Sequence, residues 1–406
     1  MNHPLAATLS GIDIAAARDF ASLQGANVGV LGNQASVDKA GRQLVDLLQS
    51  SGNCQLTKLF SPEHGFHGQA QDMEAVANRS DAKTGIEIVS LYGDSEDSLK
   101  PRHEDFSSID ILVVDLRDIG TRYYTYAQTL AYCMEAAGQT DTKIIVLDRP
   151  NPIGGIHIEG SPLEKSCRSF CGIGPIPNRH GMTLGELALM FRQGFGEGPD
   201  ALETRDCDLE IIKTAGWQRA LYLDDTDIPW INPSPNMRSM EAAIAYPGTC
   251  LFEATNLSEG RGTESPLLQI GAPYADPQLW IESIRSIDLP SEGATFEPTT
   301  FTPSFQKHAG QQCRGLQIRI QDRNSFQPYR CGIAILIAAA KAFPNDFAWR
   351  SEPYEFKPDI PAIDLLYGSP TLRNAIEGNA PIDTVIQQME SFETWHKAAR
   401  NEFLLY

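Results

Sequence analysis

The sequence lacks any segment suited to crossing a membrane or directing secretion. No run of about 18 apolar residues occurs, so the sequence predicts no transmembrane helix. The first eight residues carry neither a basic stretch nor a long apolar core, and so they do not resemble a secretory signal. These features favour a cytoplasmic protein, with an exported protein whose leader has been trimmed as the alternative.

Positive charge is scarce relative to negative charge. The chain has 33 Lys and Arg residues against 52 Asp and Glu residues, which gives a formal net charge of −19. Such a surface repels phosphate backbones and anionic lipids, so we expect neither nucleic acid nor membranes as partners. This balance still allows a local basic pocket in one cleft.

Cysteine is present, but not in the pattern of a disulfide framework or a zinc site. The eight cysteines are spread along the chain, and only Cys167 and Cys171 lie close together. No second close pair completes a zinc site, and several cysteines lie in apolar stretches, which is typical of buried thiols. We therefore expect free thiols and a reducing compartment.

Three motifs of common α/β enzymes are missing. The first predicted strand is not followed by the glycine-rich fingerprint that binds dinucleotides, and the chain contains no phosphate-binding P-loop. The G-x-S-x-G elbow of the α/β-hydrolases is also absent. These absences weigh against nicotinamide, nucleoside-triphosphate and serine-hydrolase chemistry, and we expect no cofactor.

The first half of the chain alternates between strands and helices. Apolar runs predict strands at 28–31, 56–60, 86–92, 109–116, 144–147 and 209–213. Helical spacing predicts helices at 12–23, 41–48, 124–137 and 184–191, the last preceded by a capping box at Thr183 and Glu186, and 94–104 is expected to be a loop. This alternation predicts the α/β class with a Rossmann-like parallel sheet.

The pattern changes after a proline-rich connector at 227–236. Beyond it the sequence predicts extended chain at 299–303, a strand at 316–320, a buried helix at 333–343 and an amphipathic helix at 382–404. We therefore expect a Rossmann-like domain over residues 1–228 and a smaller α+β auxiliary domain over residues 229–406.

The loop after the second predicted strand carries the first candidate catalytic residue. Pro62 ends the strand, and Glu63, His64 and His67 follow before Gly68. In an open parallel sheet such a loop leaves the edge where ligands bind, so Glu63 is a candidate for proton transfer. A polar surface loop is an equally good interpretation of these residues alone.

Other acids follow buried strands or lie in glycine-containing loops. Asp118 is close to Arg122 and three tyrosines, and Glu253 precedes the polar loop that runs from Asn256 to Thr263. Aromatic rings can stack on sugars and arginine can fork onto a carboxylate. For Asp115 and Asp148, which end strands, a structural capping role is favoured. His64-x-x-His67 is only a weak metal signal, and we expect no metal.

Ordered motifs along almost the whole chain resemble the exo-β-N-acetylmuramidase family (NamZ). They are Gly32–Ala35, Ser61–Gly65 with Gly68, Leu91–Gly93, Asp115–Tyr126, Asp148–Pro152, Asn232–Met237, Glu253–Asn256, Gly260–Thr263, Tyr367–Ser369 and Phe403–Tyr406. The resemblance implies a Rossmann-like domain, an auxiliary domain and an active site in the cleft between them. It implies release of N-acetylmuramic acid from the non-reducing end of peptidoglycan fragments, with the catalytic glutamate at Glu63.

The remaining site assignments are our own expectations. Glu63 is the expected general acid, with Glu253 or Asp118 as the second carboxylate. Because N-acetylmuramic acid carries a lactyl carboxylate, Arg122 or Arg261 is expected to bind that group. Six further residues are expected to contact the hydroxyl and acetamido groups of the sugar: Asn33, His64, Tyr124, Asn236, Asn256 and Thr263.

Three other functions stay open at this stage. One is a saccharide-binding protein without catalysis, and another is an exo-glycosidase specific for N-acetylglucosamine. A metal-dependent hydrolase that uses His64 and His67 is a distant third.

Overall fold

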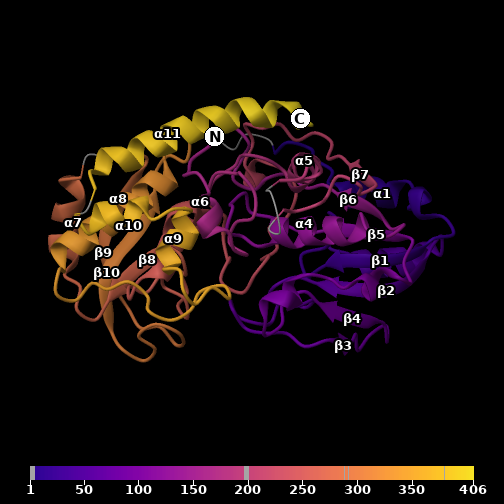
Figure 1. Cartoon of the computed structure of the whole chain (residues 1–406), viewed down its shortest axis with the longest axis horizontal. Helices are drawn as coiled ribbons and strands as arrows, with labels where there is room; N and C mark the ends of the chain where they lie inside the picture. The colour runs from indigo at the N-terminus through magenta and orange to yellow at the C-terminus, as the bar shows by residue number, and fades with distance from the viewer. Residues whose placement is uncertain (1–4, 196–200, 288, 291, 379) are drawn as a thin grey trace.

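The structure is a computed structural model that describes residues 5–195, 201–287, 289–290, 292–378 and 380–406. Residues 1–4, part of the segment in which we expect no secretory signal, lie outside the described residues. A mostly parallel sheet occupies one end of the molecule, and a small antiparallel sheet with several helices occupies the other (Figure 1). In the described part of the chain, no helix is long and apolar enough to cross a membrane.

The larger sheet has seven strands in the order β3-β4-β2-β1-β5-β6-β7, and only the short β3 runs antiparallel to its neighbour. The strands are β1 (Asn27–Gly32), β2 (Gln55–Ser61), β3 (Arg79–Ser80), β4 (Glu87–Ser90), β5 (Ile111–Asp115), β6 (Lys143–Leu147) and β7 (Leu209–Ile212). The parallel strands follow the doubly wound order, in which the chain turns back between β1 and β5. The predicted α/β class and parallel sheet are confirmed.

Helices cover the faces of this sheet. They are α1 (Gly11–Ala17), α2 (Leu44–Ser51), α3 (His103–Phe106), α4 (Tyr126–Ala137) and α5 (Leu184–Phe191). The predicted capping box of α5 is confirmed, because Thr183 Oγ1 accepts from the Glu186 amide and Glu186 Oε2 accepts from the Thr183 amide. The loop predicted at 94–104 is wrong in part, since it contains a 3₁₀ turn at Glu96–Leu99 and the start of α3.

The second half contains an antiparallel sheet in the order β8-β10-β9. Its elements are β8 (Gln269–Ala272), β9 (Ala294–Phe301), β10 (Cys313–Ile320), α6 (Met240–Thr249), α7 (Pro277–Arg285), α8 (Pro328–Ala342), α9 (Ala362–Tyr367), α10 (Thr371–Ile376) and α11 (Ile382–Ala399). Helix α6 was not predicted, because Pro247 and Gly248 interrupt the helical spacing of its apolar residues. A Cβ atom at Gly332 would lie 2.5 Å from Gly248 Cα, so the crossing of α6 and α8 requires glycine.

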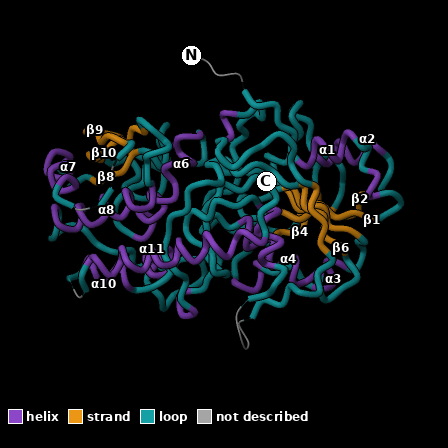
Figure 2. The backbone as a smooth tube through the Cα atoms, turned by 90° about the horizontal axis from the view of Figure 1, so that it is seen from above, coloured by secondary structure: helices purple, strands orange, loops and turns teal. Residues whose placement is uncertain are grey.

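The C-terminal helix α11 runs along the top of the molecule, from the second half toward α5 (Figure 1). The sequence predicted this helix to residue 404, but it ends at Ala399 and a 3₁₀ turn follows at Arg400–Glu402. Seen from above, loops fill most of the region between the two sheets (Figure 2). The candidate site is built largely from such loops.

Candidate active site

Glu63 lies at the carboxyl end of β2, where the chain turns sharply away from the sheet. Pro62 follows the strand, and His64 and Gly65 adopt left-handed conformations with φ of 71° and 77°. The Glu63 side chain is only 6% exposed. Its Oε2 accepts a hydrogen bond from Thr125 Oγ1 at 2.8 Å, and its Oε1 accepts one from the Met73 amide at 3.2 Å. Both carboxyl oxygens are therefore held in place.

Thr125 links Glu63 to the point where the strand order reverses. It is the N-cap residue of α4, at the end of the loop that follows β5. The helix begins two residues later than predicted, because Tyr124 belongs to that loop. Open α/β sheets bind ligands at this reversal, so the fold places Glu63 where a ligand is expected.

Glu63 lines a small cavity of about 40 Å³, which we call the inner cavity. Its wall is made by loops from both halves of the chain. The lining residues are Glu63, His64, Asp72, Met73, Tyr123, Tyr124, Thr125, Tyr126, Ser234, Asn236, Met237, Tyr246, Glu253, Arg261, Leu267, Tyr354 and Glu355. Three glutamates and one aspartate thus meet in one buried space.

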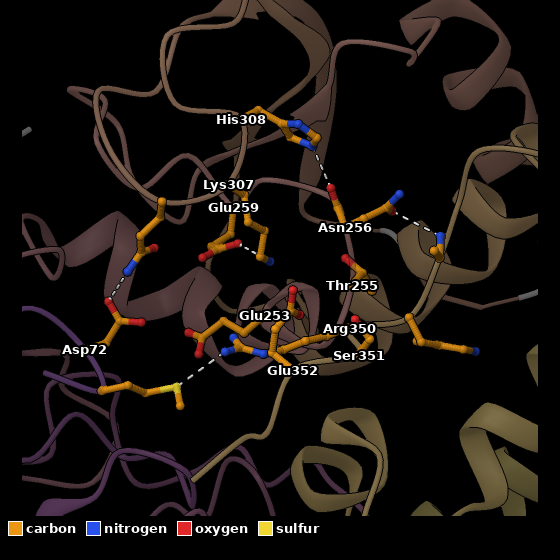
Figure 3. Close-up of a pocket in the computed structure, with 14 residues that line it drawn as sticks. Asp72, Glu253, Thr255, Asn256, Glu259, Lys307, His308, Arg350, Ser351 and Glu352 are labelled. Atoms are coloured by element: carbon orange, nitrogen blue, oxygen red, sulfur yellow. Dashed lines mark hydrogen bonds and ion pairs between the residues drawn. The ribbon is translucent and has the colours of Figure 1, made fainter. Parts of the chain in front are cut away.

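A larger cavity of about 610 Å³, the outer cavity, adjoins the inner one. Asp72, Met73 and Glu253 line both cavities. The outer cavity is also lined by residues of three later segments (Figure 3): Thr255, Asn256, Glu259, Gln306, Lys307, His308, Ala348, Trp349, Arg350, Ser351 and Glu352. Its size suits a small organic ligand such as a saccharide unit, whereas the inner cavity is close to the volume of one water molecule.

Arg261 organises the acids between the two cavities. Its guanidinium donates to Glu253 Oε1 at 2.6 Å, to Glu259 Oε1 at 3.0 Å and to Asp72 Oδ1 at 3.1 Å. Burial raises the pKa of Glu253, although Arg261 opposes this rise. Burial also acts to raise the pKa of Asp72. At this residue, however, the charge of Arg261 and the hydrogen bond from the Gln306 amide outweigh burial, so the pKa of Asp72 is lowered.

Glu355 is a buried carboxyl that the sequence analysis missed. Tyr92 OH donates to its Oε2 at 3.2 Å, and the residue lines the inner cavity with Glu63. Burial, with the charges of Glu63 and Glu253, raises the pKa of Glu355 well above its ordinary value. No periodic pattern marks this residue, and the only sequence signal is an acid placed between Tyr354 and Phe356.

Several predicted site residues do line the cavities. Glu63, His64, Tyr124, Asn236, Glu253 and Arg261 line the inner cavity, and Asn256 lines the outer one. His64 Nδ1 contacts Ala70 O at 3.0 Å, and Asn236 Nδ2 donates to Gln71 Oε1 at 3.0 Å. These contacts fix the loop that follows Glu63.

Arg122 does not reach either cavity. It is completely buried, and its guanidinium donates to four backbone carbonyls: Ser161, Ile176, Leu366 and Tyr367. These bonds join loops of the first half to the end of α9. The geometry contradicts the expectation that Arg122 binds a substrate carboxylate.

Asp118, Asn33 and Thr263 also lie outside the two cavities. Asp118 accepts from the Gly120 amide at 2.7 Å and shapes its own loop, which argues against its role as second carboxylate. Asn33 donates to Tyr126 OH at 2.8 Å and so supports the cavity wall from behind. Thr263 lines a separate surface cavity with Arg238.

His64 and His67 do not converge. His67 Nε2 lies 3.2 Å from Asp81 Oδ1, whereas His64 faces the inner cavity. Among the described residues, no group of three or more His, Cys, Asp or Glu side chains is arranged to hold a metal ion.

The acids that end the central strands have structural roles. Asp115 Oδ2 accepts from Arg149 Nη2 at 2.7 Å. Asp148 accepts from Thr183 Oγ1, the Gly185 amide and Tyr406 OH, each at 2.7 Å. Asp148 therefore holds both the start of α5 and the C-terminus, which confirms the favoured capping interpretation for this residue, whereas the Asp115 side chain forms an ion pair.

Comparisons with known proteins agree with this architecture. The family model described as "Exo-beta-N-acetylmuramidase NamZ, N-terminal" matches residues 28–241, and its C-terminal counterpart matches residues 244–406. The chain is 39% identical to the peptidoglycan beta-N-acetylmuramidase NamZ of Bacillus subtilis (strain 168) over 397 residues, 98% of this chain and 91% of the relative.

Two crystal structures of DUF1343 family proteins from Bacteroides fragilis are also similar. One matches with a TM-score of 0.87 at 28% identity, covering 99% of this chain and 100% of that protein. The other matches with a TM-score of 0.73 at 28% identity, covering 98% of this chain and 99% of that protein. With both family models matched in order along the chain, this protein belongs to the NamZ exo-β-N-acetylmuramidase family.

Proposed function

We propose that this protein is an exo-acting β-N-acetylmuramidase that releases N-acetylmuramic acid from the non-reducing end of peptidoglycan fragments. Family membership supports the reaction and the sugar. The structural observation that carries the proposal is the burial of Glu63 with further carboxyl groups in one cavity beside a space of saccharide size. Glycoside hydrolysis commonly requires such a pair of carboxyl groups.

Glu63 is the proposed general acid. A glycosidase must protonate the leaving oxygen while positive charge develops on the sugar ring. Because Thr125 and the Met73 amide each hold one oxygen of Glu63, its carboxyl has a fixed orientation in the cavity wall. Fixed orientation favours proton transfer along one direction.

Glu253 is the proposed second carboxylate. Burial raises the pKa of Glu253, but Arg261 and Tyr354 OH, which each donate to it at 2.6 Å, oppose this rise and favour the charged form. Glu355 lines the same cavity, but among the described residues no cation forms an ion pair with it, and burial raises its pKa well above the ordinary value. A charged Glu253 would stabilise the positive charge that develops on the sugar.

The test is release of nitrophenol from paired β-glycosides of N-acetylmuramic acid and N-acetylglucosamine. We expect wild type to turn over the muramic substrate, and Glu63→Gln to lose at least about 100-fold in kcat, because general acid catalysis is commonly worth that much. The glutamine keeps the shape and the acceptor oxygen, so the thermal midpoint of unfolding should stay close to wild type.

Other outcomes decide between the alternatives. Turnover of the N-acetylglucosamine substrate alone would replace the proposed sugar specificity. Binding of N-acetylmuramic acid without turnover of any substrate would favour a saccharide-binding protein. Undiminished turnover by Glu63→Gln would remove Glu63 as the acid.

A reducing compartment, and hence a cytoplasmic location, is part of the proposal. All eight cysteines are free thiols, and seven of them are buried. Free buried thiols are typical of proteins from reducing compartments. Fractionation of the source cells with an antibody against the protein checks this location.

A further inference from the structure

Discrimination of N-acetylmuramic acid from N-acetylglucosamine requires recognition of the lactyl carboxylate, and this inference rests on the proposed function. The cavities are lined by several acids, which repel an anionic substrate: Glu63, Asp72, Glu253, Glu259, Glu352 and Glu355. A cation whose charge is not already neutralised is therefore needed in the wall.

Two of the cations that line the cavities are already paired with carboxylates of the protein. Arg261 donates to three carboxylates, Asp72, Glu253 and Glu259. Lys307 Nζ donates to Glu259 Oε2 at 2.8 Å and to the carbonyls of Phe252 and Leu257 at 2.8 and 2.9 Å. An ammonium group has three protons, so Lys307 has none left for a ligand.

Arg350 is different from both. Within the described residues it forms no ion pair with a carboxylate, and its buried Nε has no hydrogen-bond partner. Its Nη2 makes only a long contact of 3.4 Å to Pro353 O and one of 3.9 Å to Met73 Sδ, which is a weak acceptor. Burial of such a donor is costly unless a ligand satisfies it.

Arg350 is linked to Glu63 through Met73. Its Nη2 contacts the side chain of Met73, whose backbone amide donates to Glu63 Oε1. Its guanidinium carbon lies 5.3 Å from the centre of the Tyr354 ring, and Tyr354 OH donates to Glu253. In Figure 3, Arg350 points toward Asp72 and Glu253. These two residues and Met73 line both cavities.

We propose that Arg350 binds the lactyl carboxylate of the substrate and so determines the specificity for muramic acid. A carboxylate that binds Arg350 through both of its oxygens would lie in the outer cavity, and Met73 would separate it from the Glu63 carboxyl. The sugar ring would then lie against the shared wall, within reach of the catalytic groups. Neighbouring Trp349, which also lines the outer cavity, offers an apolar face to that ring.

The test compares two substrates, the nitrophenyl β-glycoside of N-acetylmuramic acid and its lactyl methyl ester, in which a methyl group removes the charge of the carboxylate. For Arg350→Met we expect kcat/KM on the acid to fall by about 10- to 100-fold, the range for loss of a hydrogen bond between charged groups. We expect kcat/KM on the ester to change by less than about 3-fold, because the ester has no charge for Arg350 to bind. Arg350→Lys should lie between wild type and Arg350→Met on the acid.

Arg238→Met is the matched control. Arg238 lines the separate surface cavity, and its guanidinium donates to the carbonyls of Pro235 and Thr263. It should behave as wild type on both substrates. Calorimetric binding of free N-acetylmuramic acid to Glu63→Gln with and without Arg350→Met gives a second readout that does not depend on turnover, and affinity should fall in the double variant.

The outcomes separate the two proposals. If wild type turns over the acid and Arg350→Met does so equally well, or loses acid and ester to the same extent, Arg350 is not the specificity residue. If wild type turns over neither substrate and does not bind the free sugar, the proposed function itself fails.

Discussion

Three arginine residues around this site have three different roles. Arg122 is buried among carbonyl oxygens and holds loops together, and Arg261 is neutralised by three acids. Among the residues that the structure describes, Arg350 has no acidic partner and makes one long contact to a carbonyl, that of Pro353. The sequence shows only that each arginine lies in a polar segment. Their roles depend on partners that lie far away in the chain, so we could not predict them from local pattern.

The charged form of Glu355 destabilises the folded state. It is buried beside Glu63 and Glu253, and no cation forms an ion pair with it among the described residues. Since its pKa is raised on folding, the native state holds a proton that the unfolded chain releases above about pH 4.5, near the ordinary value for glutamate. The contribution of this group to the free energy of unfolding therefore decreases as the pH rises.

Replacement of Glu355 by Gln removes this titration. The amide oxygen can still accept from Tyr92 OH, so the geometry is preserved. We expect Glu355→Gln to match wild type near pH 4.5 and to exceed its free energy of unfolding by about 1 kcal/mol or more at pH 7.5. Urea unfolding at the two pH values measures the difference.

Glu352→Gln serves as the control for this prediction. Glu352 is exposed, three residues from Glu355 in the chain, and should give the wild-type pH dependence. If Glu355→Gln also follows wild type at both pH values, then Glu355 is not held protonated by the fold.

At the scale of elements, α11 connects the two halves of the molecule. Glu393 accepts from Arg330 Nη1 and Nη2 of α8, both at 2.8 Å, and from the Gly160 amide at 2.9 Å. Near its end, Arg400 Nη1 donates to Gly181 O at 2.7 Å. The helix thus joins α8 to two loops of the first half, as its course in Figure 1 indicates.

Removal of the charge on Glu393 tests this connection. We expect Glu393→Gln to lower the free energy of unfolding by about 1–3 kcal/mol, because Arg330 keeps its charge and loses a paired, mostly buried carboxylate. Glu390→Gln changes an exposed glutamate on the same helix and should shift the free energy by less than about 0.5 kcal/mol. Equal effects of the two variants in urea unfolding would contradict a connecting role for Glu393.

Elements with a regular apolar pattern were predictable, and others were not. The strands at β1, β5 and β6 are buried on both faces, so their sequences read as continuous apolar runs. Helix α6 was missed because a proline inside the pattern normally ends a helix. Glu63 and Glu253 were predicted from loops and do meet in one cavity. Glu355 and Arg350 were missed because they lie in a segment without periodicity.

At the scale of the whole molecule, α11 also places a buried histidine where the two halves meet. His396 is completely buried, and its Nε2 contacts His180 O at 3.1 Å. Burial lowers the pKa of His396 to about 3. The histidine is therefore neutral in the native state at any pH above that value, whereas in the unfolded chain it gains a proton below about pH 6.5.

This difference predicts sensitivity of the native state to acid. As the pH falls from about 6.5 toward 3, the unfolded state binds a proton that the native state does not, so the free energy of unfolding decreases. By pH 4.5 the loss from this residue should reach about 2 kcal/mol. The protonation of Glu355 acts in the opposite direction over part of this range, so the wild-type profile alone cannot isolate His396.

The variant His396→Gln isolates the effect. Glutamine does not titrate, and its amide can still donate to His180 O, so the contact between α11 and the first half is retained. We expect the variant to lose about 2 kcal/mol less than wild type between pH 7 and pH 4.5 in urea unfolding. His103→Gln, at an exposed histidine, should follow wild type over the same range. If His396→Gln loses as much stability as wild type, then His396 takes up a proton in the native state, and burial does not govern its charge.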